Sequence, residues 1–433
     1  MKEIRFVSAD EAVSHIKSHC HIHLSSVASV PHILIQALCR RADAGEVEDL
    51  HFHHFHTEGP APYSEPRYEG IFFEQGFFVG PNVRANVNAG YADYLPVHLG
   101  ESQKLYRDGF IKLGAALVNV SRPDANGMVS LGTSVDCSVA AVETAELVIG
   151  VINPNVPYAH GDLVSLDRFD YLVEDDTPLV TAHFAEPTPT EVLIGKNCAA
   201  LVEDGDCIQM GIGALPNALA AQLGNHKNLG LHTEMFADGL LRLIKSGVIN
   251  GACKKIDTGK VVASFLLGSQ DVYSFIDDNP DVLMKDIAYT NNPWVIAQNP
   301  NMKAINSATE VDLTGQISAD SIGMRIFSGT GGQLEFVKGA TMSKGGKSIT
   351  AFASRTNKGK NKIVSALNPG AGVVTPRADA HWIVTEYGAV DLYGKSLPER
   401  AKLMISIAHP DDREMLDREA FERFGPHWHN FSI

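Results

Sequence analysis

The stretch from Cys207 to Phe236, CIQMGIGALPNALAAQLGNHKNLGLHTEMF, decides the fold that we expect for this chain. A short apolar run breaks into Gly211-Ile212-Gly213, and the apolar residues from Leu215 to Leu223 then recur at helical spacing. A second apolar run follows a polar loop, and Glu234 comes at its end. This pattern predicts a strand, a glycine turn, a helix and a second parallel strand, so the fold class is α/β.

Two chemical groups are expected at one edge of this sheet. The glycine turn precedes a helix N-terminus, where backbone N–H groups lack helical partners, and Glu234 ends the neighbouring strand. A carboxylate facing free N–H donors could act as a nucleophile whose oxyanion intermediates those donors stabilise. The alternative is an ordinary βαβ unit with a solvated glutamate, and the stretch alone leaves both interpretations open.

The composition is that of a globular protein of two or three domains. The chain has 433 residues, of which 44% are hydrophobic and 20% are charged, and it contains 38 glycines. Its formal net charge of −15 argues against a nucleic-acid surface. Phosphate binding of that kind needs clustered Lys and Arg, and we expect no such cluster in this chain.

The sequence carries no secretory or membrane signal. The first stretch, MKEIRFVSADEAVSHIKS, lacks the apolar core of a signal peptide, and no apolar run is long enough to cross a membrane. The six cysteines are scattered singly, without any CxxC pair. We therefore expect free thiols and a cytoplasmic location.

An internal repeat predicts two homologous halves. HLSSVASVPHILIQAL aligns with IQMGIGALPNALAAQL at an offset of 185 residues, which places Pro31 on Pro216. At the position of Glu234 the first copy carries Phe55. An acidic, proline-spaced stretch around residues 174–190 lacks periodicity, so we place the boundary there and predict domains at 1–186 and 187–433.

Four histidines cluster on a predicted strand of the first half, at His51, His53, His54 and His56. Alternating histidines can bind zinc, but neither a cysteine nor an acidic residue stands among them. We favour polar filling near the mouth of a site and predict no metal.

A series of motifs carries a resemblance to a known family. They are GYADYLPVHLGE, NPNVPYAHGD, DYLVEDDTPL, GIGALP, HTEMFADG, TNNP, SGTGGQLEF, SKGGK, VTEYGAVDLYGKSLPERA and ISIAHPDDRE, in this order. Together they resemble the acetyl-CoA hydrolase/transferase family of class I CoA transferases over nearly the whole chain. The resemblance implies two CoA-transferase-type α/β domains with largely parallel sheets, an active site in the cleft between them, and a catalytic glutamate that matches Glu234.

The activity that the resemblance implies is transfer of CoA between short carboxylic acids. It would proceed with ping-pong kinetics through a glutamyl-CoA thioester, with the acyl-CoA as substrate and no further cofactor. The length and first-half motifs look most like members that act on 4-hydroxybutyrate and acetate. Butyryl-CoA:acetate transfer and acetyl-CoA hydrolysis are the alternatives within the family, and a non-catalytic acyl-CoA-binding protein is the competing class.

The site residues follow from the chemistry and from the resemblance. We expect Glu234 as the nucleophile, Asn291 as a side-chain donor beside it, and Gly332 as a backbone donor to the oxyanion. The expected CoA-binding residues are Gly211, Ile212, Gly213, Ala214, Leu215, Ser328, Gly331, Gly332 and Lys344. The alternatives are a simple turn at Gly331 and Gly332, an Asx turn at Asn291 and a solvated surface lysine at Lys344.

The acyl pocket and the assembly are less explicit in the sequence. Segments 71–73 and 77–79 are rich in phenylalanine and predict a cover over the acyl pocket or a subunit contact. His53 or Gln75 could reach a 4-hydroxyl group on the substrate. We expect a homodimer or a dimer of dimers, because closed twofold assemblies are the commonest oligomers.

Overall fold

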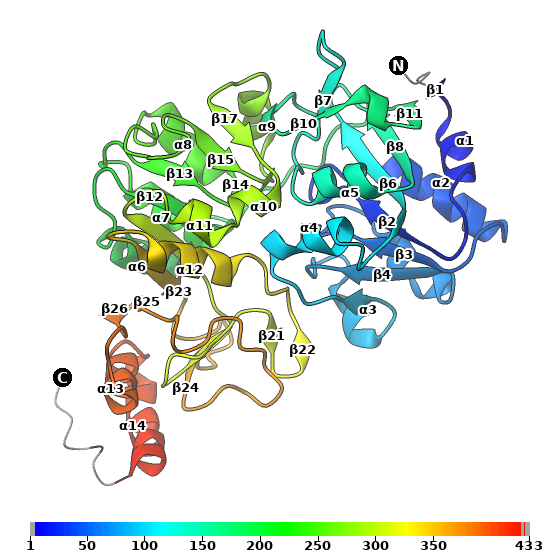
Figure 1. The fold of residues 1–433 in the computed structure, drawn as a ribbon. Coiled ribbons are helices and arrows are strands. Elements are labelled where there is room, and N and C mark those ends of the chain that lie inside the picture. Colours follow the sequence, from blue (N-terminus) through cyan, green and yellow to red (C-terminus); the bar gives the residue numbers. More distant parts are fainter. Residues whose placement is uncertain (1–4, 426–427, 429–433) are drawn as a thin grey trace. The chain divides into compact units, whose positions relative to one another are not determined.

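A computed structural model describes residues 5–425 and Trp428, which form two compact units (Figure 1). The first unit comprises the described residues up to His183 together with 234–237 and 262–291. The second comprises 184–233, 238–261 and the described residues from Asn292 onward. The boundary between residues 186 and 187 stays a prediction about domains.

An eight-stranded, all-parallel sheet forms the middle of the first unit, in the order β1-β11-β8-β6-β2-β3-β4-β5. Alternation along β2 places Ile22 and Leu24 in an apolar core with the first two helices, and turns His23 toward Tyr106 and Ser138 of two later helices. Helices therefore cover both faces, as is usual for a parallel sheet. The strands are β1 (Arg5–Phe6), β2 (Cys20–Leu24), β3 (Leu50–His53), β4 (Phe72–Gly76), β5 (Asp93–Tyr94), β6 (Leu113–Val120), β8 (Leu147–Ile152) and β11 (Tyr171–Glu174), and the helices are α1 (Ala9–Ser14), α2 (His32–Asp43), α3 (Arg84–Ala89), α4 (Leu99–Arg107) and α5 (Ser138–Thr144).

Segments from later in the chain complete the first unit. Leu266 N donates to Thr133 O at 3.0 Å and Ala182 N donates to Gly268 O at 3.0 Å, so these segments hydrogen-bond to the N-terminal part of the chain. Their elements are β14 (Met235–Phe236), which pairs in parallel with β16 (Phe265–Leu266), β17 (Val282–Met284), which pairs with β9 (His160–Gly161), α9 (Gln270–Ile276) and α10 (Ile287–Thr290); β7 (Met128–Ser130) and β10 (Leu163–Ser165) form an antiparallel pair.

The second unit contains parallel strands in the order β25-β23-β18-β12-β13, with β26 antiparallel at one edge. These are β12 (Cys207–Met210), β13 (Gly230–His232), β18 (Met302–Asn306), β23 (Lys347–Ala351), β25 (Trp382–Thr385) and β26 (Gly388–Asp391), with α6 (Pro189–Ala199), α7 (Ala214–Gln222), α8 (Asp238–Lys245), α11 (Pro293–Ile296) and α12 (Gln333–Met342); β15 (Val261–Ala263) lies where the chain passes from one unit to the other. Strand, glycine turn, helix and parallel strand occur within 207–236 as predicted.

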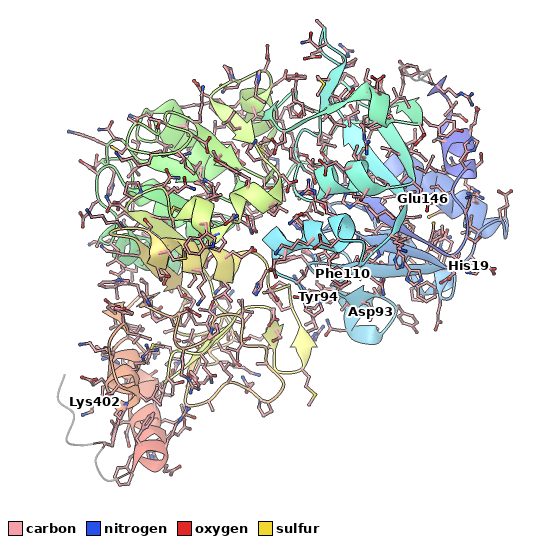
Figure 2. The ribbon with its side chains drawn as sticks, in the orientation of Figure 1. His19, Asp93, Tyr94, Phe110, Glu146 and Lys402 are labelled. Carbon is pink, nitrogen blue, oxygen red and sulfur yellow. The ribbon has the colours of Figure 1, made fainter. Side chains whose placement is uncertain are left out.

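A smaller group of elements follows β18 and the C-terminal helices end the unit. The smaller group contains a sheet of β20 (Ile317–Ser318), β19 (Glu310–Asp312) and β24 (Ile363–Val364) and a hairpin of β21 (Ser321–Ile322) and β22 (Arg325–Ile326). The C-terminal helices are α13 (Leu397–Ser406) and α14 (Pro410–Phe424). Figure 2 labels Lys402 of α13, whose ammonium lies 5.2 Å from the ring centroid of Trp428. Trp428 is buried against these helices and donates its indole N–H to Asp417 at 3.0 Å.

The predicted repeat is present as a matching succession of elements. In the first unit β2, α2 and β3 form a parallel strand–helix–strand arrangement, as β12, α7 and β13 do in the second. In the aromatic segments, Phe72 and Phe77 are buried in the first unit and Phe73 stacks on His51. That these segments cover the acyl pocket or a subunit contact stays a prediction. Among the described helices, none combines the length and the apolar character that a bilayer crossing requires.

Candidate active site

Glu234 lies on a short, tightly held turn of the first unit. It directly precedes β14, and its side chain is half-buried. Its carbonyl oxygen accepts hydrogen bonds from Ser264 N at 3.0 Å and from Phe265 N at 3.2 Å. These bonds fix the backbone that carries the carboxylate.

Asn291 meets this carboxylate. It is fully buried at the end of α10, and its Nδ2 donates to Glu234 Oε2 at 2.5 Å. Glu234 and Asn291 are 57 positions apart in the chain, and the structure places them side by side, as the sequence analysis expected. An amide donor held against a carboxylate can also donate to an oxyanion that forms at the same place.

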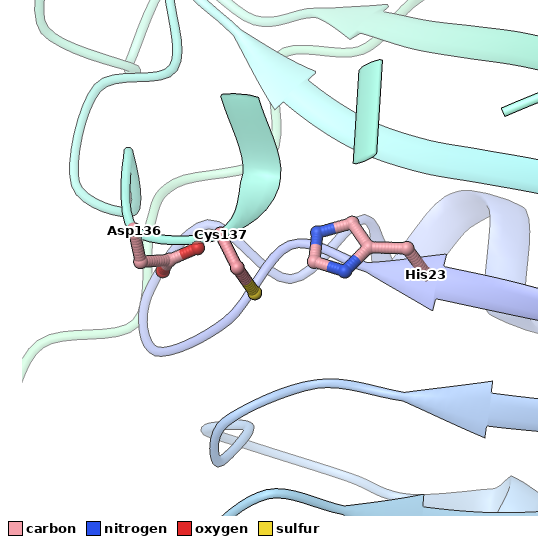
Figure 3. A group of neighbouring side chains, drawn as sticks. All are labelled: His23, Asp136 and Cys137. Atoms are coloured by element: carbon pink, nitrogen blue, oxygen red, sulfur yellow. The ribbon is translucent and has the colours of Figure 1, made fainter. Parts of the chain in front are cut away.

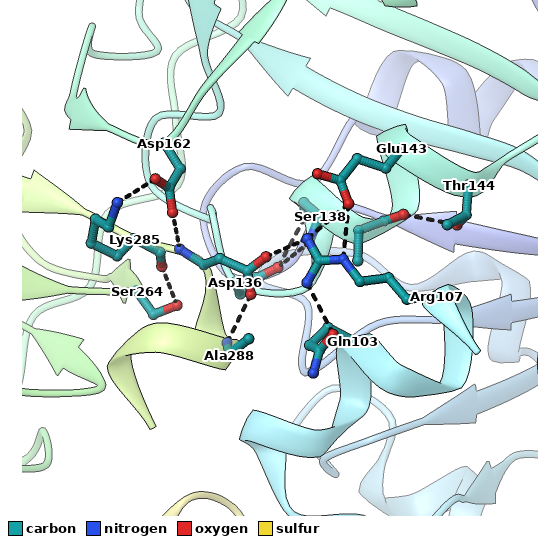
Figure 4. A network of polar contacts seen from close by, with 12 residues as sticks. Gln103, Arg107, Asp136, Ser138, Glu143, Thr144, Asp162, Ser264, Lys285 and Ala288 are labelled. Atoms are coloured by element: carbon teal, nitrogen blue, oxygen red, sulfur yellow. Dashed lines mark hydrogen bonds and ion pairs between the residues drawn. The ribbon is translucent and has the colours of Figure 1, made fainter. Parts of the chain in front are cut away.

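The start of α10 is anchored by a partly buried ion pair. Asp286 caps the helix, since its Oδ1 accepts from Ala288 N at 2.7 Å, and its Oδ2 accepts from Arg107 Nη2 at 2.7 Å. Arg107 also donates to Glu143 Oε2 at 2.8 Å and to Gln103 Oε1 at 2.9 Å (Figure 4). Burial raises the pKa of the Asp286 carboxyl above its usual value, and the hydrogen bonds from Ala288 and Arg107 oppose that rise.

A second set of bonds ties the segment of Asn291 to the segment of Glu234. Asp286 N donates to Asp162 Oδ2 at 2.7 Å, and Lys285 forms an ion pair with the same carboxylate (Figure 4). Lys285 N donates to Ala263 O at 2.8 Å, and Lys285 O accepts from Ser264 Oγ at 2.8 Å. Because Ser264 in turn holds the backbone of Glu234, one network positions both members of the pair.

His23, Asp136 and Cys137 form a buried cluster near α10 (Figure 3). One ligand atom from each lies within 4.8 Å of the others, which is a spacing that could hold a metal ion. His23 already uses both ring nitrogens, with Ser138 Oγ at 2.9 Å and Tyr106 OH at 3.2 Å. Burial raises the pKa of the Cys137 thiol well above its usual value.

We therefore interpret this cluster as a hydrogen-bonded network that supports α10. Asp136 Oδ1 accepts from the backbone and the hydroxyl of Ser138, each at 2.9 Å, and Ser134 donates to Oδ2. The carbonyl of Asp136 accepts from Ile287 N at 3.2 Å, in the first turn of α10. Burial raises the pKa of Asp136 to about 6 and lowers that of His23 to about 3.

The histidines that the sequence analysis singled out lie on β3 and the loop after it. His51 contacts Asp49 Oδ1 at 2.9 Å and Gln75 Oε1 at 3.3 Å. His53 Nε2 lies 2.8 Å from Nδ1 of His21. The other two are held as well, with His54 Nε2 3.2 Å from Tyr63 OH and His56 Nε2 3.5 Å from Glu58 Oε1. They are polar residues built into the interior of the first unit.

The glycine turn of the second unit lies at the carboxyl edge of its sheet. Gly211, Ile212 and Gly213 follow β12 directly, and Gly213 has a φ of +117°, a region that glycine favours. Ala214 and Leu215 begin α7, and Gly211 is exposed. The first N–H groups of a helix have no helical acceptor, so this turn offers donors to an anion.

The second glycine cluster lies at the same edge. Helix α12 connects β18 to its parallel neighbour β23, so its N-terminus lies at the carboxyl edge of these strands. Gly331 and Gly332 are buried just before α12, and Gly331 has a φ of +61°. Ser328 donates its hydroxyl to Ala319 O at 3.0 Å, which holds the loop in place.

Lys344 lies at the opposite edge. It is exposed in the loop between α12 and β23, and its carbonyl accepts from Asn301 N at 2.8 Å, just before β18 begins. Lys344 therefore lies beside the amino ends of β18 and β23. Strand direction therefore places Gly211–Leu215, Gly331 and Gly332 at the carboxyl edge of the sheet and Lys344 at the amino edge. That these residues and Ser328 bind CoA stays a prediction.

Sequence reasoning missed the residues that anchor α10. Asp286 had a local signal, because an Asp before a short helical segment is a common N-cap. Arg107 had none, since it lies 179 positions from Asp286 and their pairing depends on the tertiary fold.

Comparisons with known families and proteins agree over most of the chain. The family described as acetyl-CoA hydrolase/transferase matches through its N-terminal domain at residues 3–182 and through its C-terminal domain at residues 268–420. A succinyl-CoA:acetate/propanoyl-CoA:succinate CoA transferase of Fasciola hepatica is 43% identical over 96% of this chain and 87% of its own. A 4-hydroxybutyrate coenzyme A transferase of Clostridium kluyveri is 41% identical over 97% of this chain and 98% of its own.

Solved structures give the same picture. RipA from Yersinia pestis has a TM-score of 0.91 at 33% identity, covering 97% of this chain and 98% of its own. A 4-hydroxybutyrate CoA-transferase from Porphyromonas gingivalis has a TM-score of 0.84 at 35% identity, with the same coverage of both chains.

Proposed function

Because the chain belongs to the acetyl-CoA hydrolase/transferase family and is a short-chain acyl-CoA:carboxylate CoA-transferase, we propose that it works by ping-pong chemistry on Glu234. The carboxylate of Glu234 attacks the thioester carbonyl of the donor, the C–S bond breaks, and a mixed anhydride and CoA thiolate result. The thiolate attacks the glutamyl carbonyl and releases the donor acid. The glutamyl-CoA thioester then passes CoA to the acceptor acid by the reverse steps.

The observation that carries this proposal is the contact between Asn291 Nδ2 and Glu234 Oε2 at 2.5 Å. Each attack on the glutamyl carbon or on the substrate places negative charge on an oxygen, and a fixed amide donor stabilises that charge without reorganisation. In the same proposal, the backbone N–H groups of Gly332 and of the turn from Gly211 to Leu215 bind the CoA thioester, together with Ser328 and Gly331.

Covalent trapping tests the mechanism. After incubation with acetyl-CoA and borohydride or hydroxylamine, the peptide that contains Glu234 is expected to carry the corresponding modification, and the Glu234→Gln protein is expected to carry none. A modification that persists in Glu234→Gln would move the nucleophile elsewhere. An unmodified wild-type peptide, with transfer activity intact, would exclude the covalent route.

For the acceptor, we propose a four-carbon acid whose distal carbon bears oxygen, with 4-hydroxybutyrate as the first choice and acetate as its exchange partner. Two relatives of similar identity support this class, since one is named for succinate and the other for 4-hydroxybutyrate. Butyryl-CoA:acetate transfer is the alternative, supported by a relative of Anaerostipes caccae with that name at 32% identity.

An acceptor competition with acetyl-CoA as donor decides among these acids. We expect kcat/KM to be highest for 4-hydroxybutyrate or succinate and at least tenfold lower for butyrate, because a site that hydrogen-bonds an oxygen rejects an analogue that lacks it. If butyrate equals the oxygenated acids, the proposed acceptor class is wrong and the transferase chemistry stands.

Hydrolysis is the second candidate reaction, because water could attack the glutamyl-CoA thioester. Apolar walls around a thioester suppress this reaction, so release of CoA is expected to depend on an acceptor such as acetate. Equal rates with and without acetate would make the protein an acyl-CoA hydrolase. Glu234→Asp, whose carboxylate is withdrawn by one methylene, is expected to retain residual thioesterase activity at most.

A further inference from the structure

A pocket of about 620 Å³ lies in the second unit, beside β24 and the hairpin of β21 and β22. This volume is within the range of small-molecule sites. The residues that line it combine two lysines with polar and apolar groups; they are Thr309, Glu310, Ile322, Gly323, Thr356, Lys360, Asn361, Lys362, Val364, Asn368 and Pro369. None of them is among the residues assigned above to the acyl-transfer chemistry.

The two lysines that line this pocket, Lys360 and Lys362, have no ion-pair partner among the described residues. Among the described residues, no carboxylate oxygen lies within 4.0 Å of Lys360 or Lys362. The ammonium of Lys362 lies 5.3 Å from the ring centroid of Phe352, a weak contact for a charged group. Lys362 is half-buried and Lys360 is exposed, so one ammonium lies deeper than the other.

The other polar groups of the pocket already have partners. Glu310 accepts from Asn368 N at 2.9 Å through one oxygen and from Asn368 Nδ2 through the other. Thr309 donates to two carbonyls, those of Ser318 at 3.0 Å and Ser321 at 2.9 Å. When the side-chain amide of Asn361 is oriented with its nitrogen toward Asp412, that nitrogen donates to Asp412 Oδ2 at 2.6 Å. A ligand entering the pocket would meet two unpaired ammonium groups.

The chain around this pocket is unusually basic. No Asp or Glu occurs from residue 336 to residue 378, although the whole chain has a net charge of −15. The same segment contains eight cations, which are Lys338, Lys344, Lys347, Arg355, Lys358, Lys360, Lys362 and Arg377. Three of these cations, Lys338, Lys347 and Arg355, form ion pairs with carboxylates outside the segment. Lys360 and Lys362 form no such pair among the described residues, so their positive charge stays at the pocket, where it attracts anions.

We propose that this pocket is a binding site for a phosphate group, in which Lys362 and Lys360 supply the charge. The two unpaired ammonium groups outnumber the one carboxylate that lines the pocket, that of Glu310, so the lining keeps a net positive charge. A lysine serves a phosphate group as a point charge. The phosphate could come from the nucleotide end of CoA, in which case the inference extends the proposed function, or from a free phosphorylated ligand. The experiments below separate these two sources.

The protonation of Lys362 gives the site a pH dependence. Burial lowers the pKa of this amine to about 8, and the more distant Glu386 opposes the shift. Glu310 and Lys360 are the other charged residues that line the pocket. An anion binds the protonated amine, so binding raises the pKa of Lys362 and takes up a proton. Affinity is therefore expected to be full below pH 8 and to fall as the pH rises through 8.

Calorimetric titration with adenosine 3′,5′-bisphosphate and with inorganic phosphate tests the site. Lys362→Met keeps the length of the side chain and removes its charge, and the dissociation constant is expected to rise about tenfold, as the loss of one charge-assisted contact predicts. Lys360→Met is expected to have a smaller effect. Lys358→Met is the matched control, because Lys358 is an exposed cation of the same turn that does not line the pocket. Equal thermal midpoints of the variants establish that folding is unchanged.

Titration with CoA and with 3′-dephospho-CoA identifies the source of the phosphate. If the pocket binds the nucleotide end of CoA, Lys362→Met weakens CoA binding and leaves 3′-dephospho-CoA binding unchanged. If the ligand is a free anion, Lys362→Met weakens the binding of inorganic phosphate or the bisphosphate alone. Wild-type affinity of Lys362→Met for all of these ligands would overturn the proposal. The trapping of Glu234 reports on the transfer chemistry separately, so either proposal can fail while the other holds.

Discussion

At the scale of single residues, the amide of Asn291 should matter for the rate of transfer more than for substrate binding. It donates to the carboxylate of Glu234 from a fully buried position. Asn291→Ala removes one preorganised donor, and we expect kcat to fall by about 10²–10³-fold with little change in acyl-CoA affinity.

Asn292→Ala is the matched control for that substitution. Asn292 is the next amide in the chain, but its side chain caps α11 by accepting from Trp294 N at 2.9 Å. Steady-state rates at saturating acyl-CoA should separate the two variants. A kcat for Asn291→Ala within threefold of the wild type would show that the amide does not act in the rate-limiting step.

At the scale of elements, the ion pair of Arg107 and Asp286 should act on catalysis through α10, because it fixes the start of the helix that ends at Asn291. Arg107→Met leaves the Asp286 carboxylate without its cation, so we expect a loss of about 2 kcal/mol in the free energy of unfolding and a lower kcat. Arg107→Lys keeps the charge but loses the fork geometry, and it should recover part of kcat at unchanged KM. Urea unfolding and steady-state kinetics measure the two effects.

Arg40→Met provides the comparison for Arg107→Met. Arg40 pairs with Asp10 on the surface of the same unit, with the two side chains 54% and 63% exposed. Exposed pairs contribute little, so this variant should keep both stability and kcat. If Arg107→Met also kept its kcat while losing stability, the pair would be structural only.

The same scale shows what the sequence could and could not predict. Local hydrophobic spacing was sufficient for β12, α7 and β13, and the family resemblance supplied the pairing of Glu234 with Asn291. The place of Lys344 depends on the direction of α12 relative to parallel strands, which its local sequence does not encode. The partner of Arg107 is fixed only when β-strands and helices from distant segments have packed.

At the scale of the molecule, buried histidines should make the first unit sensitive to acid. Burial lowers the pKa of His23 and His53 to about 3 and that of His54 and His56 to about 4. The unfolded chain binds these protons near pH 6.5 and the folded chain does not, so stability falls as the pH drops below 6.5.

Two carboxyl groups act in the opposite direction, because burial raises the pKa of Glu74 to about 8 and that of Asp136 to about 6. Four histidine protons minus two carboxyl protons leave a net difference of about two protons, or about 3 kcal/mol per pH unit between pH 6 and 5. Thermal midpoints recorded from pH 8 to pH 5 should show this decline. Glu74→Gln removes one opposing proton and should steepen it, and an unchanged slope would contradict the assignment.

The division of the first unit among three stretches of chain has a consequence for synthesis on the ribosome. Residues up to His183 emerge first, but β14, β16 and α10 belong to the same unit and end only at Asn291. A nascent chain released at a length of about 183 residues would therefore lack both Glu234 and Asn291. Domains generally fold as units during translation. This one would have to wait, with β9 lacking its partner strand β17 and α10 not yet made, until more than a hundred further residues had left the exit tunnel.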